Sequence, residues 1–197
     1  MPRRDLSRRT GSRSVRRTIL IVCEGMQESF YFQAVKRQFR LSATSIDVVT
    51  INRDSEAIIR EAVERRNDRA TDEAWCVLDT EYPADNPRFP QAVALADRER
   101  IGLAVSNPSF EYWLLLHFVY TTRGFTDNDE LFNVLKRAYP PYEKNQDCCG
   151  ALWPHQEQAK ANARRVMTEQ ARLLPAEQFP HPFTTVHLLV EYLASQQ

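Results

Sequence analysis

The chain of 197 residues lacks any long hydrophobic run. No apolar stretch approaches the roughly 20 residues that a membrane-spanning helix needs, and the N-terminus has no apolar segment typical of a secretory signal peptide. Beyond the N-terminal tail the sequence also lacks internal repeats and low-complexity runs. We therefore expect a cytoplasmic protein without a membrane segment, and a hydrophobic content of 43% is enough for a substantial core.

Cysteine is scarce, and its spacing argues against a structural metal. There are four cysteines and no Cys-x-x-Cys pair. Cys23 and Cys76 lie within apolar runs, where a thiol usually behaves as a small hydrophobic group. Cys148 and Cys149 are adjacent, and three histidines follow them, so a zinc site is the less favoured alternative. We expect these two thiols to lie in a solvent-adjacent loop.

A net charge of zero conceals an uneven distribution. Residues 1–17 hold seven arginines and one aspartate, which is a local charge of about +6, and the rest of the chain therefore carries about −6. Serine and glycine separate the arginines, so this tail cannot fold alone. Arginines in a flexible tail can neutralise nucleic-acid phosphates; the alternative is a solubilising tail or one that folds back onto the acidic body. The candidate nucleic-acid contacts are Arg3, Arg4, Arg8, Arg9, Arg13, Arg16 and Arg17.

Two apolar runs end on carboxylates. Residues 18–23 lead into Glu24, and residues 75–78 lead into Asp79-Thr80-Glu81. Continuous apolar runs indicate parallel strands buried on both faces, and their carboxyl ends meet at the sheet edge where open α/β proteins bind ligands. Three acids held close together repel one another unless a cation lies between them. The pattern predicts a site for Mg²⁺ or Mn²⁺ at this edge.

The order of elements predicts an α/β fold with a parallel four-stranded sheet and helices on both faces. Strands are expected near residues 18–24, 45–51, 75–79 and 101–105, with helices at 27–40, 54–69 and 91–100 between them. Residues 82–90 contain three prolines and are expected to form a loop over the acidic edge. Further helices are predicted at 129–139, 156–174 and 185–193. We divide the chain into a tail (1–17), an α/β core (18–119) and a helical C-terminal extension packed on that core (120–197).

A nearly all-apolar segment, residues 110–119, predicts a buried helix, with Asn107 as its cap and Pro108 in its first turn. An unpartnered buried carboxylate costs several kcal/mol, so we expect Glu111 to have a metal, an arginine or several hydrogen-bond donors. Because the helix starts where the fourth strand ends, we place Glu111 at the acidic edge. The alternative is that it only faces the positive helix N-terminus or a structural arginine. His117 is expected to be a core or rim histidine.

Taken together, these motifs resemble the RloB family of bacterial phage-defence, or abortive-infection, proteins, which have a Toprim-like fold. The resemblance spans roughly residues 15–193. It rests on the strand-Glu-Gly and strand-Asp-x-acid motifs, on Asn107-Pro108-Ser109-Phe110-Glu111-Tyr112-Trp113, and on the C-terminal segment 182–190. The Toprim domain is the metal-binding fold of topoisomerases, primases and OLD-family nucleases. One departure is that its second motif is usually Asp-x-Asp, whereas Glu81 stands at the last position here.

The resemblance implies Mg²⁺-dependent cleavage of nucleic-acid phosphodiester bonds in antiviral defence, gated by a partner ATPase. In that scheme Asp79 and Glu81 hold metal, and Glu24 holds metal or manages the proton of the attacking water or leaving group. Glu111 completes a second metal position. Lys144, in a polar loop, could reach a phosphate; an ordinary surface lysine is the alternative.

Three rival functions follow from the same residues. A non-catalytic Toprim-like module that binds nucleic acid or its ATPase is favoured by the departure at Glu81. A receiver-like phosphoacceptor would also place acids after the first and third strands, but it needs a lysine after a fifth strand, and neither is evident. A topoisomerase is disfavoured because the chain is too short to add a strand-gating domain.

Overall fold

The described residues form a five-stranded sheet in the order β2-β1-β3-β4-β5. The computed structural model describes residues 17–40, 44–80, 89–172 and 180–197. The strands are β1 (Arg17–Cys23), β2 (Thr44–Thr50), β3 (Glu73–Asp79), β4 (Gly102–Asn107) and β5 (Phe183–Thr184). β1 to β4 are mutually parallel, and β5 pairs antiparallel with β4. The predicted α/β class with a mainly parallel sheet is confirmed.

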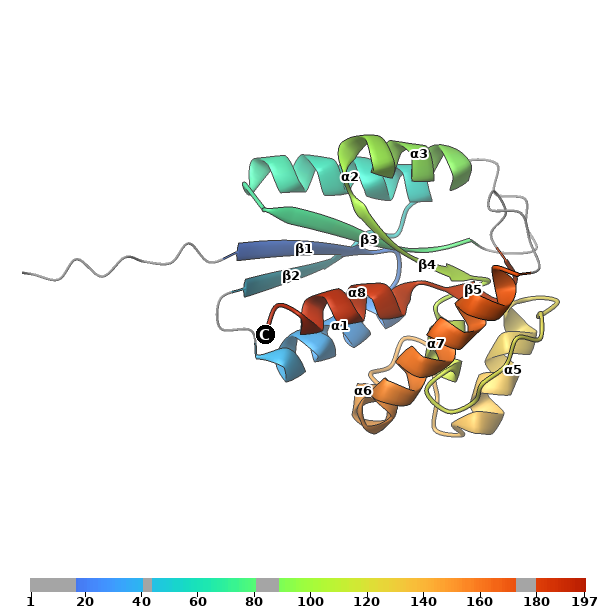
Figure 1. Cartoon of the computed structure of the whole chain (residues 1–197). Coiled ribbons are helices and arrows are strands. Elements are labelled where there is room, and N and C mark those ends of the chain that lie inside the picture. Colours follow the sequence, from blue (N-terminus) through green and yellow to red (C-terminus); the bar gives the residue numbers. More distant parts are fainter. Residues whose placement is uncertain (1–16, 41–43, 81–88, 173–179) are drawn as a thin grey trace, which may run out of the picture.

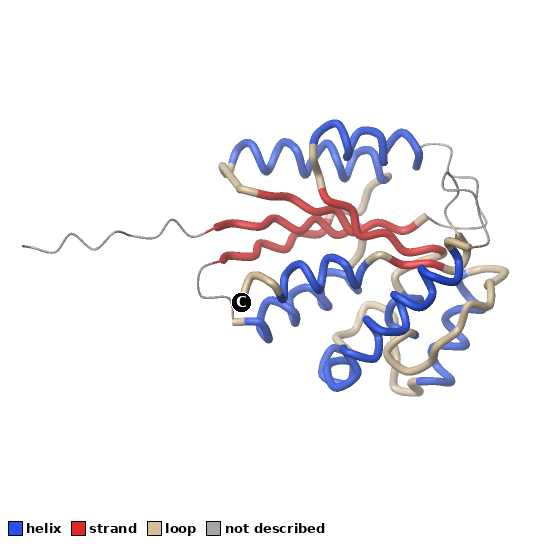
Figure 2. Tube along the Cα trace, viewed as in Figure 1, coloured by secondary structure: helices blue, strands red, loops and turns tan. Residues whose placement is uncertain are grey.

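Helices cover both faces of the sheet, as the sequence predicted. α2 (Ser55–Asp68) and α3 (Phe89–Glu99) lie on one face, while α1 (Met26–Phe39) and α8 (Val186–Ala194) lie on the other (Figures 1 and 2). The remaining helices lie on the same side of the sheet as α1 and α8, toward the carboxyl ends of the strands (Figure 1). They are α4 (Glu111–Leu115), α5 (Asn128–Ala138), α6 (Cys149–Leu152), the 3-10 helix η1 (Trp153–His155) and α7 (Gln156–Gln170).

The interior strand β1 is continuously apolar from Ile19 to its last residue, Cys23. Its residues from Ile19 to Cys23 are all 0% exposed. Successive side chains alternate between the two faces, so Ile19 and Ile21 join the core beneath α1 and α8, whereas Leu20 and Val22 join the core beneath α2 and α3. A strand buried on both faces has no solvent side, and so its hydrophobic run is continuous.

The fifth strand is a feature that the sequence did not predict. β5 is two residues long, and its pairing depends on β4: the hydroxyl oxygens of Ser106 and Thr184 are 3.1 Å apart, and the Thr185 N–H donates to the Val105 carbonyl at 2.8 Å. So short a strand has no periodic pattern of its own. It belongs to the C-terminal segment, which therefore contributes to the sheet as well as packing helices against it.

Three local expectations are wrong. The buried helix is shorter than predicted, because α4 starts at Glu111, and Asn107 does not cap it: this residue ends β4, and its Nδ2 donates to the Pro180 carbonyl at 2.8 Å. Cys148 and Cys149 are buried, 8% and 6% exposed, where α6 begins, so they are not solvent-adjacent. Arg17, assigned to the tail, is the first residue of β1.

Within the described ranges, none of the helices combines the length and the apolar character that a membrane crossing requires.

Candidate functional site

The sheet register brings the first two predicted acids together. Cys23 is opposite Val77, so Glu24 and Asp79 both lie at the carboxyl ends of adjacent strands. The Glu24 N–H donates to the Val77 carbonyl at 3.2 Å, and the Asp79 N–H donates to Glu24 Oε2 at 3.2 Å. From β1 the chain adds β2 on one side and then crosses over to add β3 and β4 on the other side. The boundary between β1 and β3 is therefore the topological switch point, where folds of this kind bind ligands.

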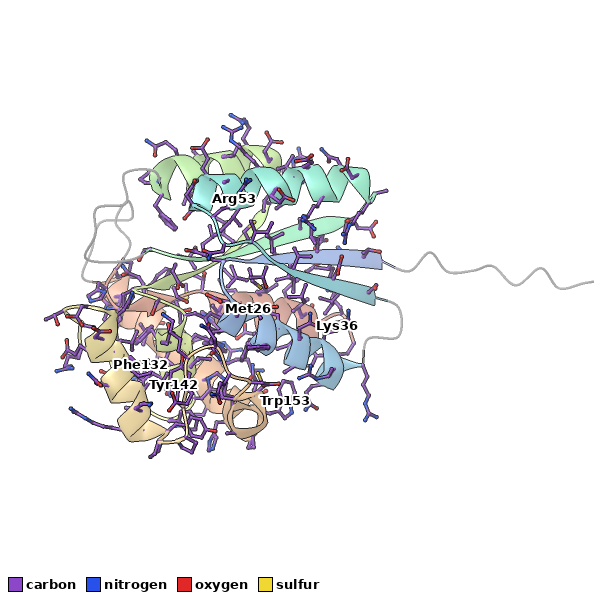
Figure 3. The ribbon with its side chains drawn as sticks, turned by 180° about the vertical axis from the view of Figure 1, so that it is seen from behind. Met26, Lys36, Arg53, Phe132, Tyr142 and Trp153 are labelled. Atoms are coloured by element: carbon purple, nitrogen blue, oxygen red, sulfur yellow. The ribbon has the colours of Figure 1, made fainter. Side chains whose placement is uncertain are left out.

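Glu111 reaches the same region from α4. It is 8% exposed, and two hydroxyls donate to it: Ser109 Oγ to Oε2 at 2.7 Å and Tyr142 OH to Oε1 at 3.1 Å. Of the partners expected for this carboxylate, the structure therefore shows hydroxyl donors. Tyr142 is fully buried and lies beside Phe132, in the half of the molecule below the start of α1 (Figure 3).

A fourth acid, Glu28, was missed by the sequence analysis. It lies in the first turn of α1 and is 5% exposed. A Cβ built on Gly25 would approach Glu28 Oε2 to 2.7 Å, so glycine at that position leaves room for the carboxylate. The sequence does contain a feature that could have identified Glu28: it lies four residues after Glu24. Because α1 starts soon after β1 ends, both acids lie at the same edge of the sheet.

The charges of Glu24, Glu28 and Glu111 act on Asp79, and that of Glu111 also acts on Glu28, so we call these four residues the acidic cluster. Burial, followed by the charges of Glu28, Glu24 and Glu111, raises the pKa of Asp79 well above its ordinary value. Burial, with a smaller contribution from Glu111, raises the pKa of Glu28 from 4.5 to about 7. Each effect disfavours the ionised carboxylate, so the cluster holds fewer negative charges at neutral pH unless a cation compensates them.

Two oxygens of the acidic cluster are buried without a hydrogen-bond partner in the described part of the chain: Asp79 Oδ1 and Glu28 Oε2. Carboxylate oxygens are the ligands that Mg²⁺ and Mn²⁺ prefer, so the donor chemistry fits a hard divalent cation. The described residues nevertheless contain no group of three or more His, Cys, Asp or Glu side chains already arranged to hold a metal ion.

The other predicted site residues are Lys144, Glu81 and the arginines of residues 1–17. Lys144 is exposed, and its charge lowers the pKa of Glu28, so it lies near the acidic cluster. Arg17 ion-pairs with Glu73, and its Nη1 donates to Gln196 Oε1 at 2.9 Å. Glu81 and the other six arginines of the tail (Arg3, Arg4, Arg8, Arg9, Arg13 and Arg16) lie outside the described residues.

His117 belongs to the core and not to the acidic cluster. It is 0% exposed, its Nδ1 is 3.0 Å from the Trp113 carbonyl oxygen, and its Nε2 is 3.4 Å from Gln156 Oε1. Burial lowers the pKa of the imidazole to about 4. The prediction of a core histidine is confirmed, and this side chain stays neutral near pH 7.

A cavity of about 750 Å³ lies at the opposite edge, beside the amino end of β3. Its lining includes Arg66 and Arg100 together with Asp72 and Glu73. These charges balance, and none of the acidic cluster contributes, so we place the candidate site at the carboxyl edge in spite of this cavity.

The comparison with known families agrees with the motifs on which the site is built. A family model described as RloB-like protein matches residues 19–193, whereas no curated protein and no solved structure matches the chain. The matched range includes all four members of the acidic cluster. Because it covers most of the sequence, this chain belongs to the RloB-like protein family.

Proposed function

We propose that the protein is a Mg²⁺- or Mn²⁺-dependent nuclease of a bacterial antiphage, abortive-infection defence system, gated by a partner ATPase. The observation that carries the proposal is the buried carboxylate of Asp79, whose Oδ1 lacks a hydrogen-bond partner among the described residues and which lies close to three other acids. Such a group is costly when ionised and uncompensated, and a bound cation removes that cost.

In this proposal the chain's own residues have separate roles. Asp79 and Glu28, with their unpartnered oxygens, would hold the cation together with Glu24, and Glu81 would add a ligand from the segment that follows β3. Glu111, oriented by two hydroxyl donors, would complete a second position. A divalent cation supplies charge stabilisation for the attacked phosphate and a nucleophilic water at neutral pH.

Nucleic-acid binding would come from cations outside the acidic cluster. Lys144 would contact a phosphate beside the site, and the arginines of residues 3–16 would add contacts that do not depend on base sequence. β1 runs from Arg17 to Cys23 and Glu24 follows it directly, so these arginines precede the end of the strand that lies about 20 Å from Glu24, the length of a seven-residue strand. Sixteen extended residues reach about 50 Å, which is enough to span that distance.

The Asp79→Asn variant tests the proposal. Purified wild-type and variant proteins are incubated with plasmid DNA, single-stranded DNA, RNA and tRNA in Mg²⁺, Mn²⁺ or chelator. We expect cleavage by the wild type with metal and none by the variant. Asp68→Asn, at the exposed end of α2, is the matched control and should cleave normally.

Metal binding is measured separately by thermal unfolding. A cation bound only by the folded state at 100 times its dissociation constant adds about 2.7 kcal/mol of stability. Mn²⁺ should therefore raise the melting temperature of the wild type and of Asp68→Asn, but not that of Asp79→Asn. Equal responses from all three proteins would place any metal elsewhere and remove the basis of the proposal.

One observation favours a second candidate, a non-catalytic module that binds nucleic acid or the ATPase. No three-ligand metal group is already arranged among the described residues. In that case nucleic acid should bind in chelator with the same affinity as in Mn²⁺, and no substrate should be cut.

A further inference from the structure

The buried amide of Gln27 connects the start of α1 to a distant segment of the chain. Gln27 is 4% exposed and directly precedes Glu28. Its Nε2 donates to the Gln146 carbonyl at 3.2 Å and to Cys148 Sγ at 3.5 Å, and its Oε1 accepts from the Asn145 N–H at 3.1 Å. Both ends of this one amide are thus used to hold residues 145–148, which lie more than a hundred positions away in the sequence.

The segment 142–148 is fixed at both ends next to the acidic cluster. At its start, the Tyr142 hydroxyl donates to Glu111. At its end, Gln27 holds the backbone of Asn145 and Gln146. Asn145 has a φ of 60°, in the left-handed region that asparagine adopts more readily than other non-glycine residues, which is typical of a tight turn.

Lys144 lies between these two attachments. Its side chain is exposed and forms no ion pair with the described residues. The preceding residue, Glu143, pairs instead with Lys136, whose Nζ lies 2.8 Å from Glu143 Oε1. Its charge nonetheless acts on Glu28. A lysine that forms no ion pair with the described residues, held beside carboxylates that would bind metal, is available to a phosphate.

We propose that Gln27 is a positioning residue: by fixing the backbone at Asn145 and Gln146, it holds Lys144 where the ammonium group binds a phosphate of the nucleic-acid substrate next to the acidic cluster. This inference rests on the proposed nuclease function. It assigns no contact with substrate to Gln27 itself, so removing its amide should act only through Lys144.

A double-mutant cycle tests this dependence. The variants are Gln27→Leu, Lys144→Met and the double variant, and kcat and KM are measured for cleavage of an oligonucleotide in Mn²⁺. Loss of one charge-assisted hydrogen bond, about 1.5–3 kcal/mol, corresponds to a roughly 10- to 150-fold rise in KM. We expect this rise for each single variant, a smaller change in kcat, and no further rise when Gln27→Leu is added to Lys144→Met.

Gln156→Leu is the matched control for stability. Gln156 is also a buried glutamine, 6% exposed, but its partners are Tyr31 and His117 in the core. This variant should lower the melting temperature without the rise in KM. If Gln27→Leu and Lys144→Met have effects that multiply in the double variant, or if Gln27→Leu leaves KM unchanged, the positioning role is wrong.

Amide hydrogen exchange separates this inference from the nuclease proposal. The Asn145 amide should exchange faster in Gln27→Leu than in the wild type, and at the wild-type rate in Gln156→Leu. If the wild type cleaves nothing, the nuclease proposal fails, and the same cycle is read from the dissociation constant for a single-stranded oligonucleotide in chelator. Unchanged Asn145 exchange, or a dissociation constant that responds to Gln27→Leu even when Lys144 is absent, overturns the positioning role.

Discussion

Replacing Glu28 by glutamine removes one ionisable group from the acidic cluster while keeping the size of the side chain. In the wild type this carboxylate is 5% exposed, and one of its oxygens has no hydrogen-bond partner among the described residues. Burial raises its pKa from 4.5 to about 7. The glutamine amide remains neutral at every pH, so the variant should not carry the cost of a buried charge.

The sign and size of the effect follow from this pKa. Because the folded protein binds the Glu28 proton more tightly than the unfolded chain does, this group contributes stability below about pH 4.5 that is lost as the pH rises through 7. A change from 4.5 to about 7 corresponds to about 3 kcal/mol. The variant should therefore match the wild type near pH 4.5 and exceed its free energy of unfolding by up to about 3 kcal/mol at pH 8.

Urea unfolding in chelator between pH 4.5 and 8.5 measures this difference. For a chain of this length, about 3 kcal/mol corresponds to a gain of roughly 6–12 °C in melting temperature at pH 8. Glu64→Gln, an exposed glutamate on α2, is the control and should follow the wild type at every pH. Added Mn²⁺ should narrow the gap, because a bound cation stabilises the ionised wild-type cluster.

A variant that is less stable than the wild type at pH 8 in chelator would refute the reasoning. That result would mean that the ionised Glu28 carboxylate is compensated within the chain, with Lys144 as the nearest candidate cation. A constant gap across the whole pH range would instead point to a packing difference between the two side chains.

Further predictions concern the neighbours of the acidic cluster and the arginine-rich tail. Gly25→Ala should fold with a small loss of stability, because only the far end of the Glu28 side chain must move from the new Cβ, but it should reduce Mn²⁺-dependent cleavage more than it reduces melting temperature. Tyr142→Phe removes a donor to Glu111 and should cost about 1.5–3 kcal/mol in urea unfolding at pH 7; a change below 0.5 kcal/mol would show that the hydroxyl contributes little. Deleting residues 1–16 should weaken binding to duplexes of any sequence, and if about four arginines contact phosphates, the slope of log affinity against log salt should shrink by about 3 to 4. Identical slopes for the full and shortened chains would assign the tail another role.

The sequence by itself predicted the main architecture and three of the four members of the acidic cluster. The apolar run in β1 has to be buried on both faces, and a strand of that kind is central in a parallel sheet. Once β1 and β3 are parallel, Glu24 and Asp79 must lie at one edge, because Glu24 directly follows β1 and Asp79 is the last residue of β3. The burial of Glu111 also followed from local pattern, since its neighbours in the chain are almost all apolar.

Tertiary structure alone decided the features that depend on contacts between distant residues. β5 exists because β4 offers a partner, and two residues carry no periodicity that would reveal it. Glu28 joined the acidic cluster because Gly25 leaves room for its carboxylate. The link between Gln27 and the backbone at Asn145 spans 118 positions, and no pattern in either segment encodes it. Local sequence sets which residues are buried and which are strands, whereas the approach of two side chains from remote segments is fixed only when the whole core packs.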